Sequence, residues 1–144
     1  MVNFHGPETV PAKYRDRTFY QHNPQVTLMR TDAEECAQLG KIIAEKINLS
    51  TGPVTVLLPL KAISVISAPG QKFHDPVADK VLFSTLKTFL RRDIEVIELD
   101  CAINDPVFAE TCARALLKNI EARTRTVPGK VLPPAANALD SARK

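Results

Sequence analysis

Val54-Thr55-Val56-Leu57-Leu58 is an almost continuous apolar run, and the rest of the chain can be arranged around it. A run of this kind is typical of a parallel β-strand that is covered on both faces. Residues 94–99 alternate apolar and acidic side chains, which indicates a strand with one solvated face at the edge of a sheet. Residues 26–29 predict a third, short strand, and residues 63–66 predict a small extra one.

Three helices are predicted between and after these strands. At the start of the first, residues 32–48, Thr31 and Glu34 have the spacing of a capping box. The dipeptides Asp75-Pro76 and Asp105-Pro106 predict the other two starts, each with an N-cap aspartate and a proline at the first helical position. The apolar stripe of the first helix consists of Cys36, Leu39, Ile43 and Ile47. The last helix has the clearest stripe in the chain, formed by Ala109, Cys112, Ala113, Leu116, Leu117 and Ile120.

Strands that alternate with helices predict an α/β fold with right-handed crossovers. We therefore expect a three-layer arrangement, in which a mostly parallel, open sheet carries helices on both faces. Residues 1–122 are predicted to form this α/β part, and residues 123–144 to form a basic tail rich in proline and alanine.

The composition agrees with this division. The chain has 144 residues, of which 44% are hydrophobic, enough for one core; collagen, a coiled coil and a disulfide-rich miniprotein are excluded. The net charge is +3, and residues 123–144 alone carry a surplus of four positive charges. The folded part is therefore close to neutral, which argues against a specific nucleic-acid site.

The cysteines and the hydropathy pattern point to one compartment. Cys36, Cys101 and Cys112 are odd in number and unevenly spaced, which argues against a disulfide framework or a zinc knuckle. No apolar run reaches the roughly 18 residues of a membrane span, and the first residues do not resemble a secretory signal. We expect a cytoplasmic protein without a membrane partner.

Candidate functional residues lie in three loops, because ligands of open parallel sheets bind outside the carboxyl ends of the strands. Arg30 and Thr31 precede a helix N-terminus, a position suited to an anion. Lys61 can contact a phosphate as a point charge, and His74 can act in general acid–base catalysis. The candidate anion-binding residues are Arg30, Thr31, Lys61, Ser67, Gly70 and Asn104.

Each candidate also has a purely structural interpretation. Arg30 and Lys61 can be solvated or ion-paired side chains, and His74 can be an ordinary loop histidine. Asp75 and Asp105 are interpreted as helix caps, which leaves them poorly suited to catalysis. Glycine-rich phosphate loops, the nucleophile elbow and the histidine or cysteine motifs of metal sites are absent from the sequence, so no metal site is expected.

Four segments together resemble a known family. They are residues 1–4, residues 22–31 with Asn23-Pro24, residues 67–76 with Ala-Pro-Gly and His-Asp-Pro, and residues 103–109 with Ile-Asn-Asp-Pro. The segments follow one another in the family's order, and the match runs from residue 1 to about residue 121. The chain is thereby similar to the C-terminal part of the largely uncharacterised family that contains the tomato mosaic virus resistance protein, which carries an ATP-binding-domain label.

The resemblance implies more than the residues do alone. Family members are longer, with two α/β domains, and Met-Val-Asn-Phe is internal in them. ATP with Mg²⁺ is then the implied ligand. The implied partner is another copy of the chain, in a homo-oligomer, or the missing N-terminal domain. Ala102, Ser67 and Ala62 depart from the His, Asp and Gly that are usual in the family, so chemistry carried by those His and Asp residues is in doubt here.

Three functional hypotheses remain open. The first is the C-terminal part of a nucleotide-binding protein of unknown biochemical activity. The second is an enzyme acting on a small phosphorylated or carboxylated substrate, with Arg30 and Lys61 binding the anion and His74 in acid–base catalysis. The third is an inactive truncated paralogue that acts as an assembly subunit.

Overall fold

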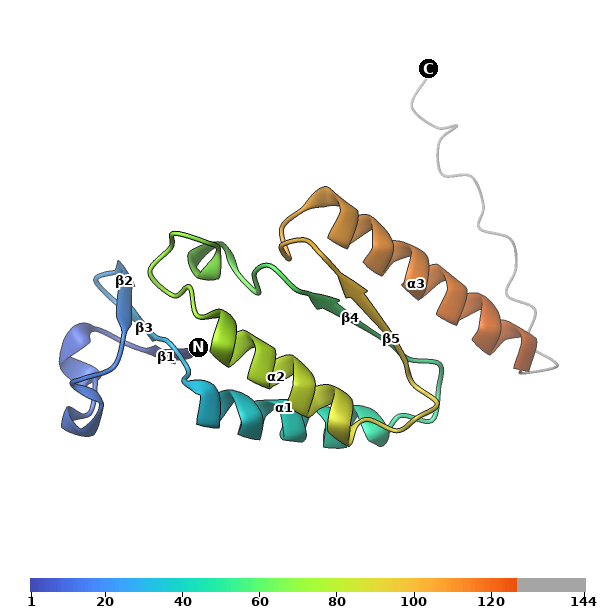
Figure 1. Cartoon of the computed structure of the whole chain (residues 1–144), viewed down its shortest axis with the longest axis horizontal. Helices are drawn as coiled ribbons and strands as arrows, with labels where there is room; N and C mark the ends of the chain where they lie inside the picture. Colours follow the sequence, from blue (N-terminus) through green and yellow to red (C-terminus); the bar gives the residue numbers. More distant parts are fainter. Residues whose placement is uncertain (127–144) are drawn as a thin grey trace, which may run out of the picture.

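The computed structural model describes residues 1–126 of the chain. Two parallel strands, β4 (Thr55–Pro59) and β5 (Glu95–Leu99), form one sheet. Helices α1 (Ala33–Asn48) and α2 (Pro76–Phe89) cover one face of this pair, and α3 (Pro106–Thr126) covers the other (Figure 1). The α/β class and the helices on both faces are confirmed. Helix α3 continues past the boundary expected at residue 122, and the rest of the predicted tail lies outside the described residues.

A second sheet corrects the expected strand pairing. The strand β3 (Val26–Met29) does not join β4 but forms the centre of an antiparallel sheet between β1 (Val2–Phe4) and β2 (Phe19–Asn23). The reason is local, because only two residues separate β2 from β3, and so short a connection joins only antiparallel strands. The side chain of Asn23 accepts a hydrogen bond from the amide of Gln25 at 2.8 Å, which stabilises this turn.

The small extra strand expected at residues 63–66 is also wrong. A single 3₁₀ turn, Val65–Ser67, occupies this part of the chain. Two more such turns, Pro7–Thr9 and Ala12–Tyr14, precede β2. The only extension of the parallel pairing among the described residues is an isolated bridge between Ala62 and Ala102.

The first helix begins one residue later than its predicted capping box. Asp32 is the N-cap, and its carboxylate accepts the amide of Glu35 at 2.9 Å. The Glu35 carboxylate accepts the Asp32 amide at 3.0 Å in return. The box therefore joins Asp32 and Glu35 rather than Thr31 and Glu34, because Thr31 is buried and its hydroxyl lies 3.5 Å from the Cys36 thiol.

The main core lies between the parallel sheet and α2. Its buried members are Val56, Leu58, Phe83, Leu86 and Ile94. Helix α1 packs on α2 through the small buried residues Cys36, Gly40 and Ala44. A Cβ atom at Gly40 would lie only 2.7 Å from the carbonyl oxygen of Leu82, so the close approach of the two helices requires glycine at this position.

Replacing Gly40 by valine is therefore expected to lower the free energy of unfolding by about 1–3 kcal/mol, because the added atoms force α1 away from α2. Urea unfolding measures the change. Gly52→Ala is the matched control, since a Cβ at Gly52 meets nothing within 4 Å. Equal free energies for the two variants would contradict the close packing at Gly40.

Most of the apolar stripe predicted for α3 is exposed rather than buried in the core. Leu116, Leu117 and Ile120 are 60%, 61% and 52% exposed, whereas Phe108 and Ala115 are the buried residues of this helix. The period of the pattern is helical as predicted, but most of the stripe does not contact the chain's own sheet. Within residues 1–126 this apolar face is without a partner, and a face of this kind is typical of an interaction surface.

Candidate functional site

The second and third loops meet at the carboxyl ends of β4 and β5. The amide of Leu60 donates to the carbonyl of Leu99 at 2.9 Å, and the amide of Lys61 donates to the carbonyl of Cys101 at 3.0 Å. One residue further, the amide of Ile103 donates to the carbonyl of Ala62 at 2.9 Å. The two loops thus leave the sheet side by side, which brings Lys61 next to the loop of residues 100–105.

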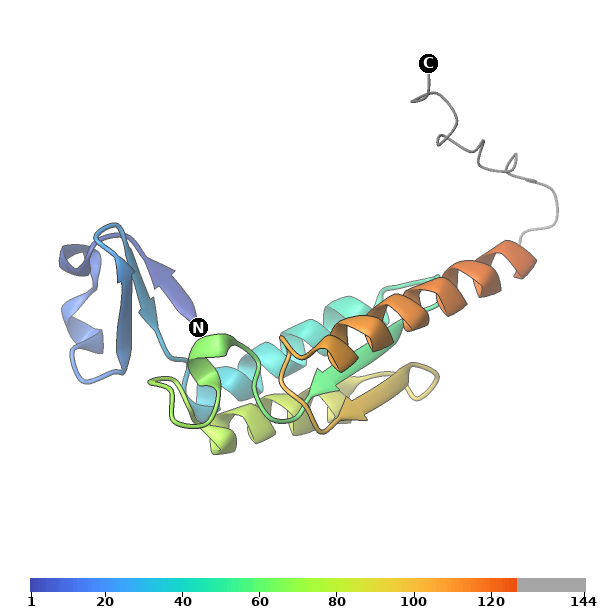
Figure 2. The same ribbon diagram turned by 90° about the horizontal axis from the view of Figure 1, so that it is seen from above.

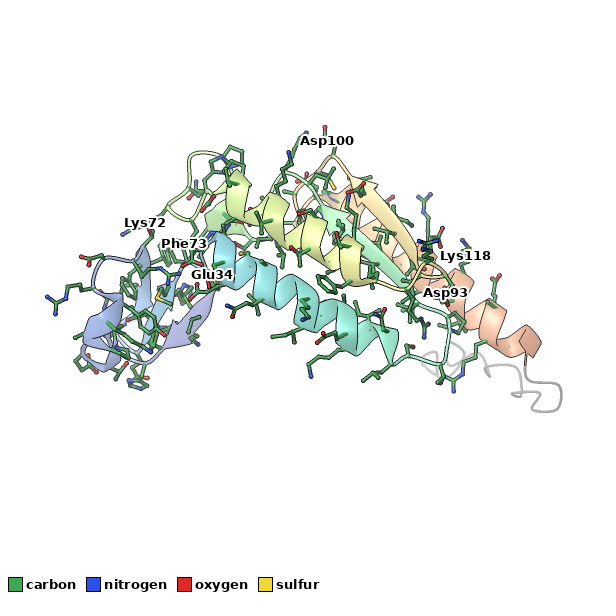
Figure 3. The ribbon with its side chains drawn as sticks, turned by 60° about the horizontal axis from the view of Figure 1, so that its bottom comes forward. Glu34, Lys72, Phe73, Asp93, Asp100 and Lys118 are labelled. Carbon is green, nitrogen blue, oxygen red and sulfur yellow. The ribbon has the colours of Figure 1, made fainter. Side chains whose placement is uncertain are left out.

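Lys61 and Asp100 form an accessible pair of opposite charges at this edge. The Lys61 Nζ atom lies 3.2 Å from Asp100 Oδ2, and the two side chains are 55% and 83% exposed. Asn104 is exposed on the same loop as Asp100. Figure 3 shows Asp100 at one end of the sheet and Asp93 and Lys118 at the other. An exposed ion pair contributes little to stability, so Lys61 and Asp100 remain available to a ligand.

Hydrogen bonds within the second loop hold its shape. The Ser67 hydroxyl donates to the carbonyl of Ser64 at 3.0 Å and accepts the Ser64 amide at 3.0 Å. Gly70 has a φ of +80°, which favours glycine at this turn. His74 is exposed, and its Nδ1 atom lies 3.2 Å from the carbonyl oxygen of Ser67. Ser67 itself is buried and occupied within the loop, so its predicted contact with a ligand is corrected to a structural role.

The first loop is held by a buried ion pair. The Arg30 Nη2 atom lies 2.5 Å from Asp79 Oδ1 and donates to the carbonyl of Asp75 at 3.2 Å. The Arg30 and Asp79 side chains are only 7% and 9% exposed. Arg30 and Thr31 are therefore internal residues rather than an open anion site. Asp79 escaped prediction, although a carboxylate one turn after Asp75 on the apolar side of α2 was a signal for it.

A second cluster that the sequence did not reveal joins the antiparallel sheet to α1. The Arg17 Nη2 atom lies 2.5 Å from Glu35 Oε2 and donates to the Arg30 carbonyl at 2.9 Å. The Arg17 Nη1 atom lies 3.3 Å from Asp32 Oδ2. The hydrogen bond from Arg17 holds the pKa of the Glu35 carboxyl below its ordinary value of 4.5. Arg17 thus links residues that precede β2 to the start of α1.

The lowered pKa of Glu35 predicts a pH-dependent contribution to stability. A lowered carboxyl pKa stabilises the folded state above the unfolded value, near pH 4.5, and this contribution disappears as the pH falls through the lowered pKa. Glu35→Gln keeps an oxygen for the capping box but removes the charge. We expect it to cost ~1 kcal/mol at pH 7 and nothing once the pH is below the folded pKa, in urea titrations between pH 2 and pH 7.

Glu34→Gln is the matched control for this prediction, because it removes the same charge from the first turn of α1 at an exposed position. A pH-independent cost for Glu35→Gln, or an equal cost for Glu34→Gln at every pH, would show that the Arg17 contact contributes nothing.

The two predicted helix caps behave differently. The Asp75 carboxylate accepts the amide of Ala78 at 2.9 Å, as an N-cap does. The Asp105 carboxylate instead turns back and accepts the amide of Ala102 at 2.9 Å, which closes the loop before α3. Cys101, in the same loop, is buried, and desolvation raises the pKa of its thiol. A protonated, buried thiol is a poor nucleophile.

The comparisons with known proteins agree with the segments singled out in the sequence. The profile of the uncharacterised protein family UPF0261, C-terminal domain, matches residues 1–120. The chain belongs to the UPF0261 family. The resemblance inferred from the four sequence segments is thereby confirmed, since the tomato ToMV resistance protein Tm-1(GCR237) from Solanum lycopersicum is 38% identical over 120 residues.

Some bacterial UPF0261 proteins are more similar to the chain than the tomato protein is. A UPF0261 protein of Rhizobium meliloti (strain 1021) is 49% identical over 119 residues, which cover 80% of this chain and 29% of the relative. One of Clostridium tetani (strain Massachusetts / E88) is 42% identical over 122 residues, or 84% of this chain and 30% of the relative. The tomato protein is covered over 16% of its length, against 82% of this chain. The chain thus spans less than a third of these relatives.

None of the helices within residues 1–126 combines the length and the apolar character needed to cross a membrane.

Proposed function

We propose that the chain is the carboxyl-terminal part of a larger nucleotide-binding protein, to which it contributes Lys61, His74 and Asn104. The observation that carries this proposal is the pairing of the two loops at the carboxyl ends of β4 and β5, which puts Lys61 beside Asp100, on the loop that also carries the exposed Asn104. Ligands of α/β proteins bind at this edge. Three unpaired cysteines among the described residues favour a reducing, cytoplasmic setting.

The charges at this edge fit ATP with Mg²⁺. An ammonium group such as that of Lys61 can bind a phosphate, and Mg²⁺ is commonly held by one or two carboxylates together with the phosphates of the nucleotide. Asp100 is the exposed carboxylate nearest to Lys61 at 3.2 Å. Gly70 and His74 belong to the loop that begins with Lys61, and His74 is the one proposed to act on the ligand from there. The rest of the site would come from the remainder of a longer chain or from another copy.

The enzyme hypothesis is weaker in this structure. It needs Arg30 and Lys61 to bind one anion together, but Arg30 is buried against Asp79. The hypothesis of an inactive assembly subunit is supported by the exposed apolar face of α3, which is suited to contact with a partner.

Calorimetry with ATP and MgCl₂ tests the nucleotide site. The protein to use is a chimera, in which residues 1–120 of this chain replace the matching segment of the Rhizobium meliloti relative. We expect binding heat from the chimera and a loss of about tenfold or more in affinity for Lys61→Gln, since a charge-assisted contact to phosphate disappears. Lys72→Gln, an exposed lysine of the same loop that lies toward the antiparallel sheet, is the control (Figure 3).

No heat from the chimera and from the intact relative would contradict nucleotide binding. Equal affinities for Lys61→Gln and Lys72→Gln would contradict the role of Lys61.

A further inference from the structure

The sheet of β4 and β5 has an open edge along β4. Within residues 1–126, β4 pairs with β5 and with no other strand. The amide of Leu60 points to β5, and alternate residues of a strand direct their backbone groups to the same side. The N–H and C=O groups of Leu57 therefore face the open edge. Pro59, which has no N–H, faces it as well, as is usual for proline in an edge strand.

Helix α3 extends beyond this open edge. Its Lys118 reaches Glu95 at the start of β5, at 3.1 Å, and its Asn119 lies against Thr55 at the start of β4. Continuing around the helix in the same direction, Ile120 and Leu116 lie past β4, on the side away from β5. These two side chains line a hollow of about 750 Å³ together with the segment of residues 49–53 that leads into β4.

Helix α1 borders the same edge from the other face of the sheet. Its Leu39 and Ile43 are each 38% exposed. They lie on the opposite flank of α1 from Lys41, whose ammonium group lies 5.3 Å from the centre of the Phe89 ring on α2. In Figure 2, α2 and β5 run along one long side of the molecule, and α1, β4 and α3 run along the other. Both helix layers are thus wider than the sheet between them.

We propose that this place, the β4 slot, receives a parallel β-strand from the part of the longer UPF0261 chains that precedes the segment matched here. The β4 slot consists of the open edge of β4 and the side chains of Leu39, Ile43, Leu116 and Ile120. The incoming strand is apolar on both faces, because α1 covers one of them and α3 covers the other.

The position of residue 1 supports this occupant. The relatives are more than three times as long as the matched segment. The amino group of Met1 lies within electrostatic range of Arg30, Glu35 and Asp79, at the starts of α1 and α2, and Figure 1 shows the N-terminus on the side where β4 ends. A parallel strand beside β4 also ends on that side, so in a longer chain it leads to the position of Met1 without crossing the sheet.

The test compares one double variant in two settings, without nucleotide, so that its result is independent of the proposed ATP site. Leu116→Glu with Ile120→Glu is made in the 144-residue chain and in the Rhizobium meliloti chimera. We expect the melting temperature of the isolated chain to change by about 1 °C or less, because both residues are exposed there, and that of the chimera to fall by ~5 °C or more. Val77→Glu is the control, because Val77 is 67% exposed on α2. It should change the melting temperature equally in the isolated chain and in the chimera.

Light scattering gives the second readout, in case a chimera variant fails to fold. The 144-residue chain is expected to be a monomer that forms a one-to-one complex when co-expressed with the preceding part of the relative, and the double variant is expected to lose this complex. A dimer of the 144-residue chain that the double variant separates would overturn the proposal, since the occupant would then be a second copy. Equal melting shifts in the two settings, or a complex that survives the double variant, would overturn it too.

Discussion

Replacing Asp79 by alanine is expected to lower the free energy of unfolding by about 3–5 kcal/mol, because it leaves the Arg30 guanidinium buried without its carboxylate. The Arg30 side chain is 7% exposed, and within residues 1–126 its Nε atom has no hydrogen-bond partner. Asp79 and the carbonyl of Asp75 are the partners of Nη2. Without Asp79, the charge of Arg30 would stay largely buried and unpaired, which costs free energy.

Urea unfolding of the single and double variants separates this cost from simple loss of volume. Arg30→Met combined with Asp79→Leu removes both charges and keeps apolar volume, so most of the lost stability should return. The free energy of unfolding is expected to be similar for the wild type and the double variant, and much lower for Asp79→Ala. A cost under about 1 kcal/mol for Asp79→Ala would mean that the pair is hydrated in solution.

Replacing Phe73 by alanine is expected to have an effect of the same size, about 3–5 kcal/mol. Phe73 is 1% exposed and is the largest fully buried side chain of the described residues. Its ring is in T-shaped contact with the Tyr20 ring, with 6.3 Å between centroids, and its amide donates to the carbonyl of Ile66 at 2.9 Å. Phe73 therefore joins the second loop to the antiparallel sheet.

The loss at Phe73 should also loosen the loop that carries Lys61 and His74. Proteolysis within residues 60–74 should become faster in Phe73→Ala, at a protease concentration that leaves the wild type intact. Tyr20→Phe is the matched control, because it keeps the ring and removes only the hydroxyl. If Phe73→Ala and Tyr20→Phe unfold at the same urea concentration, the ring of Phe73 does not hold the loop.

Local sequence patterns predicted the helices and strands better than they predicted how these elements pair and pack. The apolar run of β4 and the Asp-Pro start of α2 depend on neighbouring residues, so both were visible in the sequence. The antiparallel pairing of β3 was missed because its short apolar run matches either kind of sheet. For α3, the helical period predicts that one face is apolar, but it does not say whether the covering surface belongs to the same chain.

Part of the candidate site could be predicted from the positions of residues relative to the ends of the strands. Lys61 and Asn104 follow β4 and β5, so their loops could be placed at the carboxyl ends of strands. Whether the two loops meet depends on the order of the strands in the sheet, which the sequence does not show. For Arg30 the sequence left both an anion site and an ion pair open, because its partner Asp79 is 49 residues away in the chain. A contact of that separation leaves no periodic signal, and an arginine before a helix has the same sequence pattern whether it binds an anion or a buried carboxylate.

Two features characterise the chain. The buried Arg30–Asp79 pair closes the first loop to a ligand, and the edge of β4 is not paired with a strand within residues 1–126. The closed loop holds the starts of α1 and α2 together. The open edge of β4 lies between two helices that present apolar side chains beside it. This is the arrangement expected of one part of a larger α/β protein, in agreement with the coverage of less than a third of the UPF0261 relatives.

Hydrogen exchange at the amide of Leu57 tests the open edge most directly. In the isolated chain this N–H faces the edge of β4 and should exchange at nearly the rate of an exposed amide, whereas the amide of Leu58, which points to β5, should be protected. In the Rhizobium meliloti chimera, an added strand should slow exchange at Leu57 by about tenfold or more. An unchanged rate at Leu57 in the chimera would contradict the account of a sheet completed by the preceding part of the protein.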